Sequence, residues 1–229
     1  MIKRIKLSDS IVEYLMDKFV KKEFKPGDKI IETKIADQLN VSQGGVREAI
    51  STLISMGFLE SKPFKWTGFK KFTIKDIVDY QEIRAELEAA ALKMAIKNFN
   101  YKNIDIAYLQ DVTNKMLDGV KTNDYGKRTL YDIKFHQHLV KASNNKSLDI
   151  AWNSLGHYYW AYVWLYLDVE PLQKRTIKHN LICESLEKRD YKMSIRLIKE
   201  HFFELEKLLL KRKDLKRFNQ GHVSDLLEK

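Results

Sequence analysis

The stretch from Thr33 to Leu59 places the strongest constraint on the fold of this 229-residue chain. Its apolar residues recur at the three- and four-residue spacing of a helix face in two short blocks, which predicts two helices joined by a tight turn. Asn40 lies at the turn, where a residue that tolerates positive φ is needed, and Ser42 is placed to cap the second helix. The apolar face consists of Ile35, Ala36 and Leu39 in the first block and Val46, Ile50, Leu53 and Ile54 in the second.

The second helix leaves polar and small residues on its outer face, beginning with Gln43 and Gly44. This is how a helix-turn-helix presents side chains to the major groove of DNA. We therefore expect duplex DNA as a partner. The expected contacts from this stretch are Thr33, Lys34, Ser42, Gln43, Gly44 and Arg47, with Ser51 on the same outer face.

A short hairpin is predicted directly after the helix-turn-helix. Residues 58–60 and 68–72 can pair as two strands around a basic and aromatic tip, which would form the wing of a winged helix. Lys65, Gly68 and Lys70 are the expected DNA contacts there, because a tip of this kind suits phosphate and minor-groove binding. The alternative is an ordinary hairpin whose lysines are merely solvated.

Positive charge is unevenly distributed along the chain. The formal net charge is +10, and residues 1–75 hold 15 Lys and Arg against 9 Asp and Glu, a net of +6. Residues 76–229 hold 26 against 22, a net of only +4. The predicted helix-turn-helix thus lies in the more basic third of the chain, as a polyanionic partner would require.

The sequence carries few signs of an oxidising or membrane environment. Cys183 is the single cysteine, so an intrachain disulfide is excluded and a reducing compartment is expected. No apolar run approaches the ~18 residues of a membrane span, and the N-terminus lacks a signal-type apolar core. We therefore expect a cytoplasmic protein with no membrane partner.

Helical periodicity dominates beyond about residue 75. The expected fold class is mostly α, with an N-terminal winged helix-turn-helix domain over 1–75 and an all-helical C-terminal bundle over 76–229. Helices are predicted near 76–98, 103–121, 125–142, 146–167, 171–187 and 190–217.

A second constellation combines one acidic and three imidazole side chains in the predicted bundle. Asp132 and His136 are four residues apart on one predicted helix, so they point the same way. His179 and His201 fall on two later helices, and the break at 188–190 lets these helices turn back on each other. Such a set suits Zn²⁺, Ni²⁺, Fe²⁺ or Mn²⁺ better than Ca²⁺, which prefers oxygen ligands alone. The alternative is that each histidine is an ordinary buried core residue.

Together the two constellations, in this order, resemble a GntR-family transcriptional regulator of the FadR subfamily. In the N-terminal part the resemblance rests on residues 25–30, 35–42, 46–50 and 57–59, which begin with Lys-Pro-Gly-Asp-Lys-Ile. In the C-terminal part it rests on Arg84-x-x-Leu87-Glu88, Asp132-x-x-Phe135-His136, Ser143-Asn144-Asn145 and the pair His179 and His201.

The resemblance implies a homodimer and a ligand-binding C-terminal domain. It implies that Asp132, His136, His179 and His201 bind one divalent transition metal ion. It also implies that Arg84 and Asn145 contact an effector, with the Arg84 guanidinium matching the two oxygens of a carboxylate. The alternative role for Arg84 is an i,i+4 ion pair with Glu88, worth a few tenths of a kcal/mol (~0.2–0.5) if exposed.

The sequence departs from the family pattern at residues 43–45, Gln-Gly-Gly, where relatives usually carry Arg followed by Thr-Pro or Thr-Thr. Gln43 suits adenine, because its amide matches N6 and N7. Each glycine costs up to ~1 kcal/mol of helix propensity. Either the helix begins late, or its backbone approaches DNA closely.

An aromatic-rich stretch falls in the predicted helix near 146–167. Aromatic residues at helical spacing indicate a core or dimer interface, and the polar tips of Trp and Tyr are also able to hold an effector. The residues are Trp152, Tyr158, Tyr159, Trp160, Tyr162, Trp164 and Tyr166.

These features predict a transcriptional repressor that is not an enzyme. Its operator binding would be controlled by a small organic acid bound at the metal site. One alternative is a metal-responsive regulator whose bundle binds only the ion. The other is a metal-dependent hydrolase, which would leave the helix-turn-helix unexplained.

Overall fold

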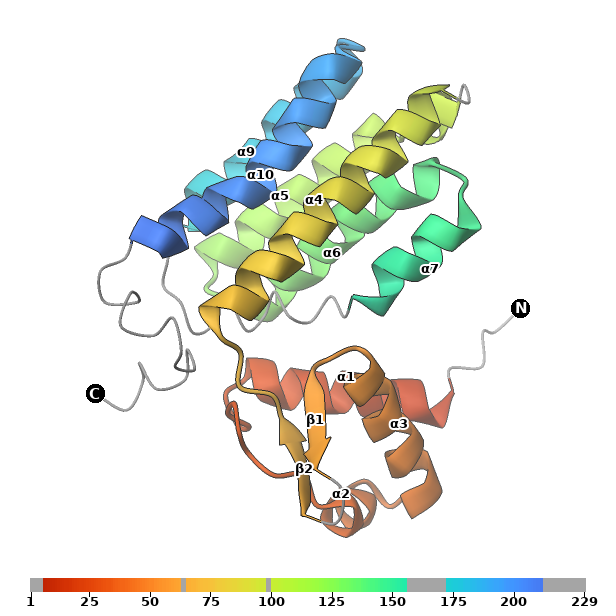
Figure 1. The fold of residues 1–229 in the computed structure, drawn as a ribbon, viewed down its shortest axis with the longest axis vertical. Helices are drawn as coiled ribbons and strands as arrows, with labels where there is room; N and C mark the ends of the chain where they lie inside the picture. Colours follow the sequence, from red (N-terminus) through yellow and green to blue (C-terminus); the bar gives the residue numbers. More distant parts are fainter. Residues whose placement is uncertain (1–5, 63–64, 98–99, 156–171, 212–229) are drawn as a thin grey trace. The chain divides into compact units, whose positions relative to one another are not determined.

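The computed structural model describes residues 6–62, 65–97, 100–155 and 172–211. The chain divides into two compact units, one extending to Phe72 and the next beginning at Thr73 (Figure 1). No helix in the described part of the chain is both long and apolar enough to cross a membrane.

In its described residues the N-terminal unit contains three helices and a two-stranded sheet, which Figure 1 shows. In the sheet the strands pair antiparallel with Leu59 opposite Phe69, and Lys29 adds an isolated bridge to Gly68. This confirms the predicted winged helix-turn-helix fold. The elements are α1 (Leu7–Val20), α2 (Glu32–Leu39), α3 (Gln43–Ser55), β1 (Leu59–Lys62) and β2 (Trp66–Phe69).

Aromatic rings form the core that joins the sheet of this unit to α1. Phe19 stacks on Phe69 with ring centroids 4.9 Å apart, and Phe58 meets Phe19 edge-on at 5.0 Å. The predicted face of α3 is buried at Val46, Ile50 and Leu53, whereas Ile54 is half-exposed.

The turn between α2 and α3 has the predicted chemistry. Asn40 adopts a left-handed conformation with φ of 51° and ends α2. The Gly45 backbone N–H donates to Ser42 Oγ at 3.3 Å, so Ser42 caps α3. The cap satisfies one of the N–H groups that have no partner inside the helix.

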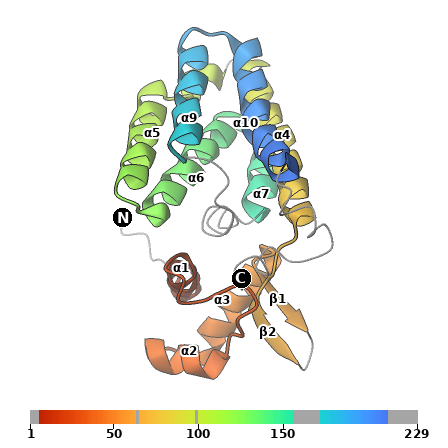
Figure 2. The same cartoon turned by 90° about the vertical axis from the view of Figure 1, so that its left-hand side faces the viewer.

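The C-terminal unit is an all-helical bundle (Figures 1 and 2). In it α5 packs against α6 and α9, whereas α10 packs against α4 and α9, and α4 also packs against α6. The elements are α4 (Ile74–Lys97), the 3₁₀ turn η1 (Asn100–Asn103), α5 (Ile106–Lys121), α6 (Tyr125–Ala142), α7 (Lys146–Ser154), α9 (Leu172–Glu187) and α10 (Tyr191–Lys211).

Capping side chains determine where helices of the bundle begin. The Tyr108 backbone N–H donates to Asp105 Oδ1 at 2.9 Å, so α5 begins at Ile106 rather than near 103 as predicted. The structure describes the predicted helix 146–167 only as far as α7 and residue 155. All its aromatic residues except Trp152 therefore lie outside the described residues, as does the end of the predicted helix 190–217.

Candidate functional site

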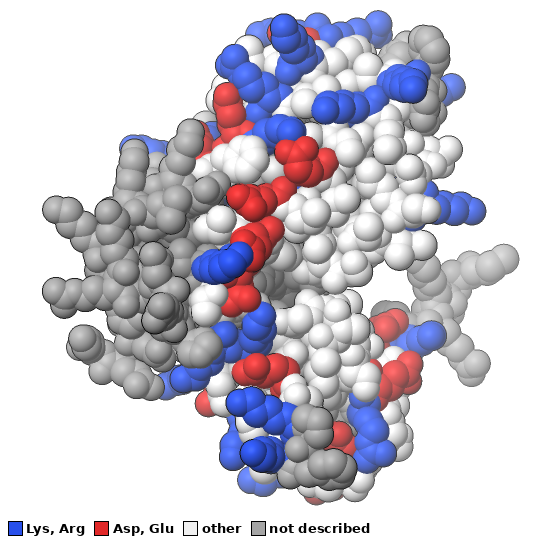
Figure 3. All heavy atoms as spheres, viewed as in Figure 1, with Lys and Arg blue, Asp and Glu red and all other residues white. Residues whose placement is uncertain are grey.

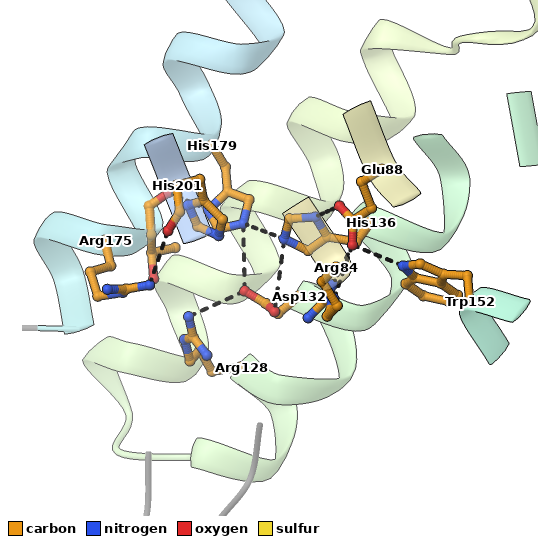
Figure 4. A network of polar contacts seen from close by, with 10 residues as sticks. Arg84, Glu88, Arg128, Asp132, His136, Trp152, Arg175, His179 and His201 are labelled. Atoms are coloured by element: carbon orange, nitrogen blue, oxygen red, sulfur yellow. Dashed lines mark hydrogen bonds and ion pairs between the residues drawn. The ribbon is translucent and has the colours of Figure 1, made fainter. Parts of the chain in front are cut away.

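Four potential metal ligands converge inside the C-terminal unit. Asp132 and His136 lie one turn apart on α6, His179 comes from α9 and His201 from α10 (Figure 4). All four are buried, and their ligand atoms lie within 4.8 Å of one another. The structure thus brings together the four side chains that the sequence pattern selected.

The spacing of the facing atoms suits a transition metal ion. His136 Nε2 lies 3.4 Å from His179 Nε2, which lies 3.5 Å from Asp132 Oδ1. His136 Nε2 is 4.0 Å from Asp132 Oδ2. Metal–nitrogen bonds of about 2.0–2.1 Å in tetrahedral geometry place ligand atoms about 3.3 Å apart. The distances among Asp132, His136 and His179 therefore approach those of a coordination shell, and the full set of four ligand atoms, which lie within 4.8 Å of one another, would draw closer around an ion.

Contacts on the far side of two rings orient them for metal binding. His136 Nδ1 donates to Glu88 Oε2 at 2.6 Å, and His179 Nδ1 donates to the Thr176 carbonyl at 3.1 Å. Each acceptor keeps the proton on Nδ1, so the lone pair of Nε2 faces the other ligands. Carboxylate and carbonyl partners of this kind are typical of histidines that bind metal.

The protonation states suit metal ligands as well. Burial lowers the pKa of His179 to about 3, against the opposing effect of the Asp132 carboxylate. Burial also lowers the pKa of His201 well below its ordinary value. Both imidazoles are therefore neutral at physiological pH, which is the form that coordinates an ion.

Asp132 is held in its ionised form. Burial by itself would raise its pKa, but the Arg128 guanidinium 3.2 Å away and the neighbouring histidines lower it to about 2. The site therefore combines one ionised carboxylate with the neutral imidazoles of His179 and His201.

Glu88 on α4 is an acidic residue with several buried partners beside this cluster, and nothing in the sequence marks it as a histidine partner. Its Oε1 accepts from Arg84 Nη2 at 2.7 Å, Arg84 Nε at 3.0 Å and Trp152 Nε1 at 2.8 Å. Its Oε2 accepts from His136. Burial would raise the pKa of Glu88, but His136 and Arg84 lower it to about 2.

The Arg84–Glu88 ion pair is therefore more important than the sequence suggested. Both side chains are 0% exposed, whereas the sequence-based estimate applied to an exposed pair. Removing one partner from a buried ion pair typically costs several kcal/mol (~3–5). The i,i+4 spacing was visible in the sequence, but the contact with His136 depends on the packing of α4 against α6.

Two further buried arginines were not predicted. Arg128 pairs with Asp132 one turn later on α6, and Arg175 Nη2 donates to the His201 carbonyl at 3.3 Å. Both lie next to the metal-ligand cluster in Figure 4.

Asn145 has a structural role at the start of α7. Its Oδ1 accepts from the Leu148 backbone N–H at 3.0 Å, and its Nδ2 lies 3.3 Å from Met94 Sδ. The first contact caps the helix, and the effector contact expected of Asn145 stays a prediction.

The predicted DNA-contact residues of the helix-turn-helix lie at the surface. Arg47 is 67% exposed and its Nη2 pairs with Glu32 Oε2 at 3.1 Å. In the view of Figure 3, lysine and arginine side chains lie along the sides and lower end of this unit, with acidic residues among them. The exposed residues are Thr33, Lys34, Ser42, Gln43, Gly44, Arg47 and Lys65, and Lys70 is half-exposed.

Three glycines of this unit have different surroundings. A Cβ at Gly44 would lie 4.0 Å from Ser42 Oγ and meet nothing nearer, whereas one at Gly45 would lie 3.0 Å from Leu7 Cδ2. Because α3 begins at Gln43, the interpretation that the helix begins late is wrong.

Gly68 is buried, and a Cβ there would lie 2.3 Å from the Asp28 carbonyl oxygen. Packing therefore explains the glycine at 68, and a buried residue is unsuited to the predicted DNA contact.

Known proteins share both halves of this architecture. Residues 7–65 match the family described as bacterial regulatory proteins, gntR family, and residues 79–204 match the FCD domain. A probable D-xylose utilization operon transcriptional repressor of Paenarthrobacter nicotinovorans is 26% identical over 201 residues, covering 86% of each chain. An Nta operon transcriptional regulator of Aminobacter aminovorans is 31% identical over 125 residues, covering 55% of this chain and 58% of its own.

Structural similarity supports the same fold. E. coli McbR/YncC superposes with a TM-score of 0.73 at 20% sequence identity, covering 90% of this chain and 98% of its own. The family and these relatives are transcriptional regulators rather than enzymes. The chain therefore belongs to the GntR family of DNA-binding transcriptional regulators, with an FCD domain as its C-terminal part.

Proposed function

We propose that this chain is a repressor whose operator binding is controlled by a small organic acid bound beside a divalent metal ion. The ion would be held by Asp132, His136, His179 and His201. The observation that carries the proposal is the convergence of these four buried ligand atoms within 4.8 Å. Three imidazoles and one carboxylate suit Zn²⁺, Ni²⁺, Fe²⁺ or Mn²⁺.

The electrostatics of the cluster support a cation. Two imidazole lone pairs that face each other at 3.4 Å beside an ionised carboxylate repel one another unless a positive charge lies between them. A bound dication removes that repulsion and leaves the ligand set with one net positive charge. The ion would then act as a Lewis acid towards an oxygen of the effector.

Buried charge near the cluster supports an anionic effector. Among the buried residues that the structure describes, the arginines are Arg84, Arg128 and Arg175, whereas the carboxylates are Glu88 and Asp132. A dication bound beside these guanidinium groups would favour a carboxylate of the effector.

The N-terminal unit would bind the operator through α3 and the hairpin. Arg47, Gln43 and Gly44 would face the major groove, with Gln43 suited to adenine, while Lys65 and Lys70 would contact phosphates. Thr33 and Lys34, in the first turn of α2, and Ser42 would contact the DNA backbone. Open space at Gly44 supports close approach of the α3 backbone to DNA.

A homodimer would present two copies of α3 to an inverted repeat. The acid would change operator affinity only through its different affinities for the two dimer shapes. We expect the acid to relieve repression. The relative from Paenarthrobacter nicotinovorans is described as a repressor, which supports this direction.

A mobility-shift assay at fixed salt tests the DNA end of the proposal. Arg47→Ala should abolish specific operator binding, and Arg196→Ala is a matched control because Arg196 is also exposed and paired, with Glu200 in the C-terminal unit. Unchanged binding by Arg47→Ala would contradict the assignment.

A thermal-shift screen of organic acids on the metal-loaded protein tests the effector end. Ligand stabilisation grows with the ratio of concentration to Kd, so at least one acid should raise the melting temperature. No response to any acid would favour a regulator that binds only the ion.

A further inference from the structure

One ion pair joins the two helices of the helix-turn-helix. Arg47 on α3 donates from Nε at 3.2 Å and from Nη2 at 3.1 Å to a single oxygen, Oε2 of Glu32. Glu32 lies 15 residues earlier, at the start of α2. Among the residues that the structure describes, Glu32 is the only hydrogen-bond partner of the Arg47 side chain. The contact therefore determines how the guanidinium group is oriented.

The backbones that carry this pair are held in place by the rest of the unit. α2 packs against α3, and each helix buries an apolar face. Ser42 caps α3 directly after the turn between them. The side chains of Glu32 and Arg47 thus start from fixed positions, and their contact restricts the rotations of the long arginine side chain. Order that exists before binding reduces the entropy that is lost on binding.

The contact occupies one edge of the guanidinium group and leaves another. A guanidinium has five N–H donors arranged in a planar fork. Glu32 accepts from the edge formed by Nε and Nη2, so the edge formed by Nη1 and the second hydrogen of Nη2 remains. The two parallel donors of this remaining edge match the acceptors O6 and N7 of guanine, or two oxygens of a phosphate.

The charge of Glu32 favours guanine over phosphate at this edge. A phosphate bound there would share one guanidinium group with the Glu32 carboxylate, so two anions would lie well inside the ~10 Å Debye length of 0.1 M salt and repel each other. The acceptors of guanine carry no formal charge and avoid this repulsion. Arg47 is also accessible, because it is 67% exposed and lies four residues after Gln43 on the outer face of α3.

We propose that Glu32 is a positioning residue that holds Arg47 for the recognition of one guanine in the operator. The inference rests on the proposed function, because it takes Arg47 as a DNA contact. Glu32 acts through Arg47, so its removal should change which base is preferred. The pair is exposed, at 67% for Arg47 and 33% for Glu32, and exposed ion pairs contribute little to stability. Variants at Glu32 should therefore fold and melt close to wild type.

The base preference of the full-length protein tests the inference. In vitro selection from a randomised duplex library would identify the DNA site that the wild-type protein prefers. Fluorescence anisotropy would then compare the affinity for this site with the affinity for each of its single base-pair variants. The protein variants are Glu32→Ala, Glu32→Gln, Arg47→Lys and Asp37→Ala.

Each protein variant separates one property from the others. Glu32→Ala removes the acceptor, whereas Glu32→Gln removes the charge but keeps an oxygen that accepts from Arg47. Arg47→Lys keeps the positive charge but loses the planar fork. Asp37→Ala is the matched control, because Asp37 is an exposed acidic residue of the same helix.

The wild-type protein should prefer guanine at one position of the site by about 5- to 150-fold, the range expected for a contact with two parallel hydrogen bonds. Glu32→Ala and Arg47→Lys should each reduce the preference at that same position at least ~5-fold and leave the other positions unchanged. Glu32→Gln should stay within about threefold of the wild-type preference, because its acceptor remains. Asp37→Ala should match wild type at every position.

Two results would overturn the role of Glu32. One is a wild-type base preference in Glu32→Ala, whether or not the variant binds DNA more tightly. The other is an equal loss in Glu32→Gln and Glu32→Ala, which would show an effect of charge alone. If Arg47→Lys still loses the guanine preference in these cases, the DNA contact of Arg47 stands. An unchanged base preference in Arg47→Lys, or no selected site for the wild-type protein, would overturn the proposed DNA contact as well.

Discussion

Glu88 offers the sharpest single-residue test of how the bundle supports its metal-ligand cluster. Replacement by Gln keeps the shape of the side chain but removes the charge that compensates Arg84. In one orientation the new amide NH₂ group would face Arg84 and Trp152, which are donors themselves, so hydrogen bonds would be lost. In the other orientation the NH₂ group would face His136 Nδ1. The imidazole proton would then move to Nε2, the nitrogen that faces the other ligands.

Both orientations have a measurable cost. Loss of one partner of a buried ion pair predicts a free energy of unfolding lower by about 3–5 kcal/mol. Loss of a partner that orients a metal-binding histidine predicts metal affinity about 10–100-fold weaker. Urea unfolding followed by circular dichroism measures the first quantity, and competition with a chromophoric chelator measures the second.

Glu86→Gln is the matched control on the same helix. Glu86 pairs with Lys199 but is 59% exposed, so its replacement should change stability by less than about 0.5 kcal/mol and leave metal affinity unchanged. Wild-type stability and metal affinity in Glu88→Gln would refute the role assigned to the buried ion pair.

The remaining predictions concern α3, the N-terminal cap and acid. Gly44→Ala should stabilise the free protein by up to ~1 kcal/mol, because alanine favours the helix and its Cβ has no neighbour nearer than 4.0 Å. The same substitution should weaken operator binding in a mobility-shift assay. Unchanged operator affinity would show that α3 does not approach DNA closely at this residue. Ser42→Ala should lower stability by about 0.5–2 kcal/mol in thermal unfolding, and a neutral result would exclude the cap. In the metal-free protein the pKa of His179 is about 3 in the folded state, below its ordinary value of 6.5. The pKa of Glu88 is about 2 in the folded state, below its ordinary value of 4.5. Because the unfolded chain binds these protons more readily, the free energy of unfolding should fall as the pH is lowered. The loss should begin near pH ~6.5 for His179 and near pH ~4.5 for Glu88. A free energy of unfolding that stays constant down to about pH 3 would contradict both shifts.

The sequence predicted local features well because they depend on short-range chemistry. Asn40 ends α2 in a left-handed conformation and Ser42 caps α3, and both follow from residue type at a turn. Asp132 and His136 converge because helix geometry places residues four apart on one face. The two later histidines join them because the bundle folds back at the break between α9 and α10.

Features that depend on packing between elements could not be predicted. Nothing near Glu88 in the sequence shows that its carboxylate meets His136 and Trp152, because these residues come from α6 and α7. The sequence predicts Gly68 only as a residue of the hairpin. The structure shows why glycine is required there, because a Cβ would lie 2.3 Å from the Asp28 carbonyl oxygen. The start of α5 was misplaced because the 3₁₀ turn before it has no clear sequence signal.

The central claim is that an acid bound at the metal-ligand cluster controls operator binding. Fluorescence anisotropy of a labelled operator with metal-loaded protein tests it directly, using the acid that gives the largest thermal shift and the double variant His179→Ala/His201→Ala. The account predicts that the acid weakens operator affinity of the wild-type protein at least ~5-fold, the lower end of typical allosteric coupling, and leaves the double variant unaffected. An equal response in the double variant, or no response in the wild-type protein, would contradict it.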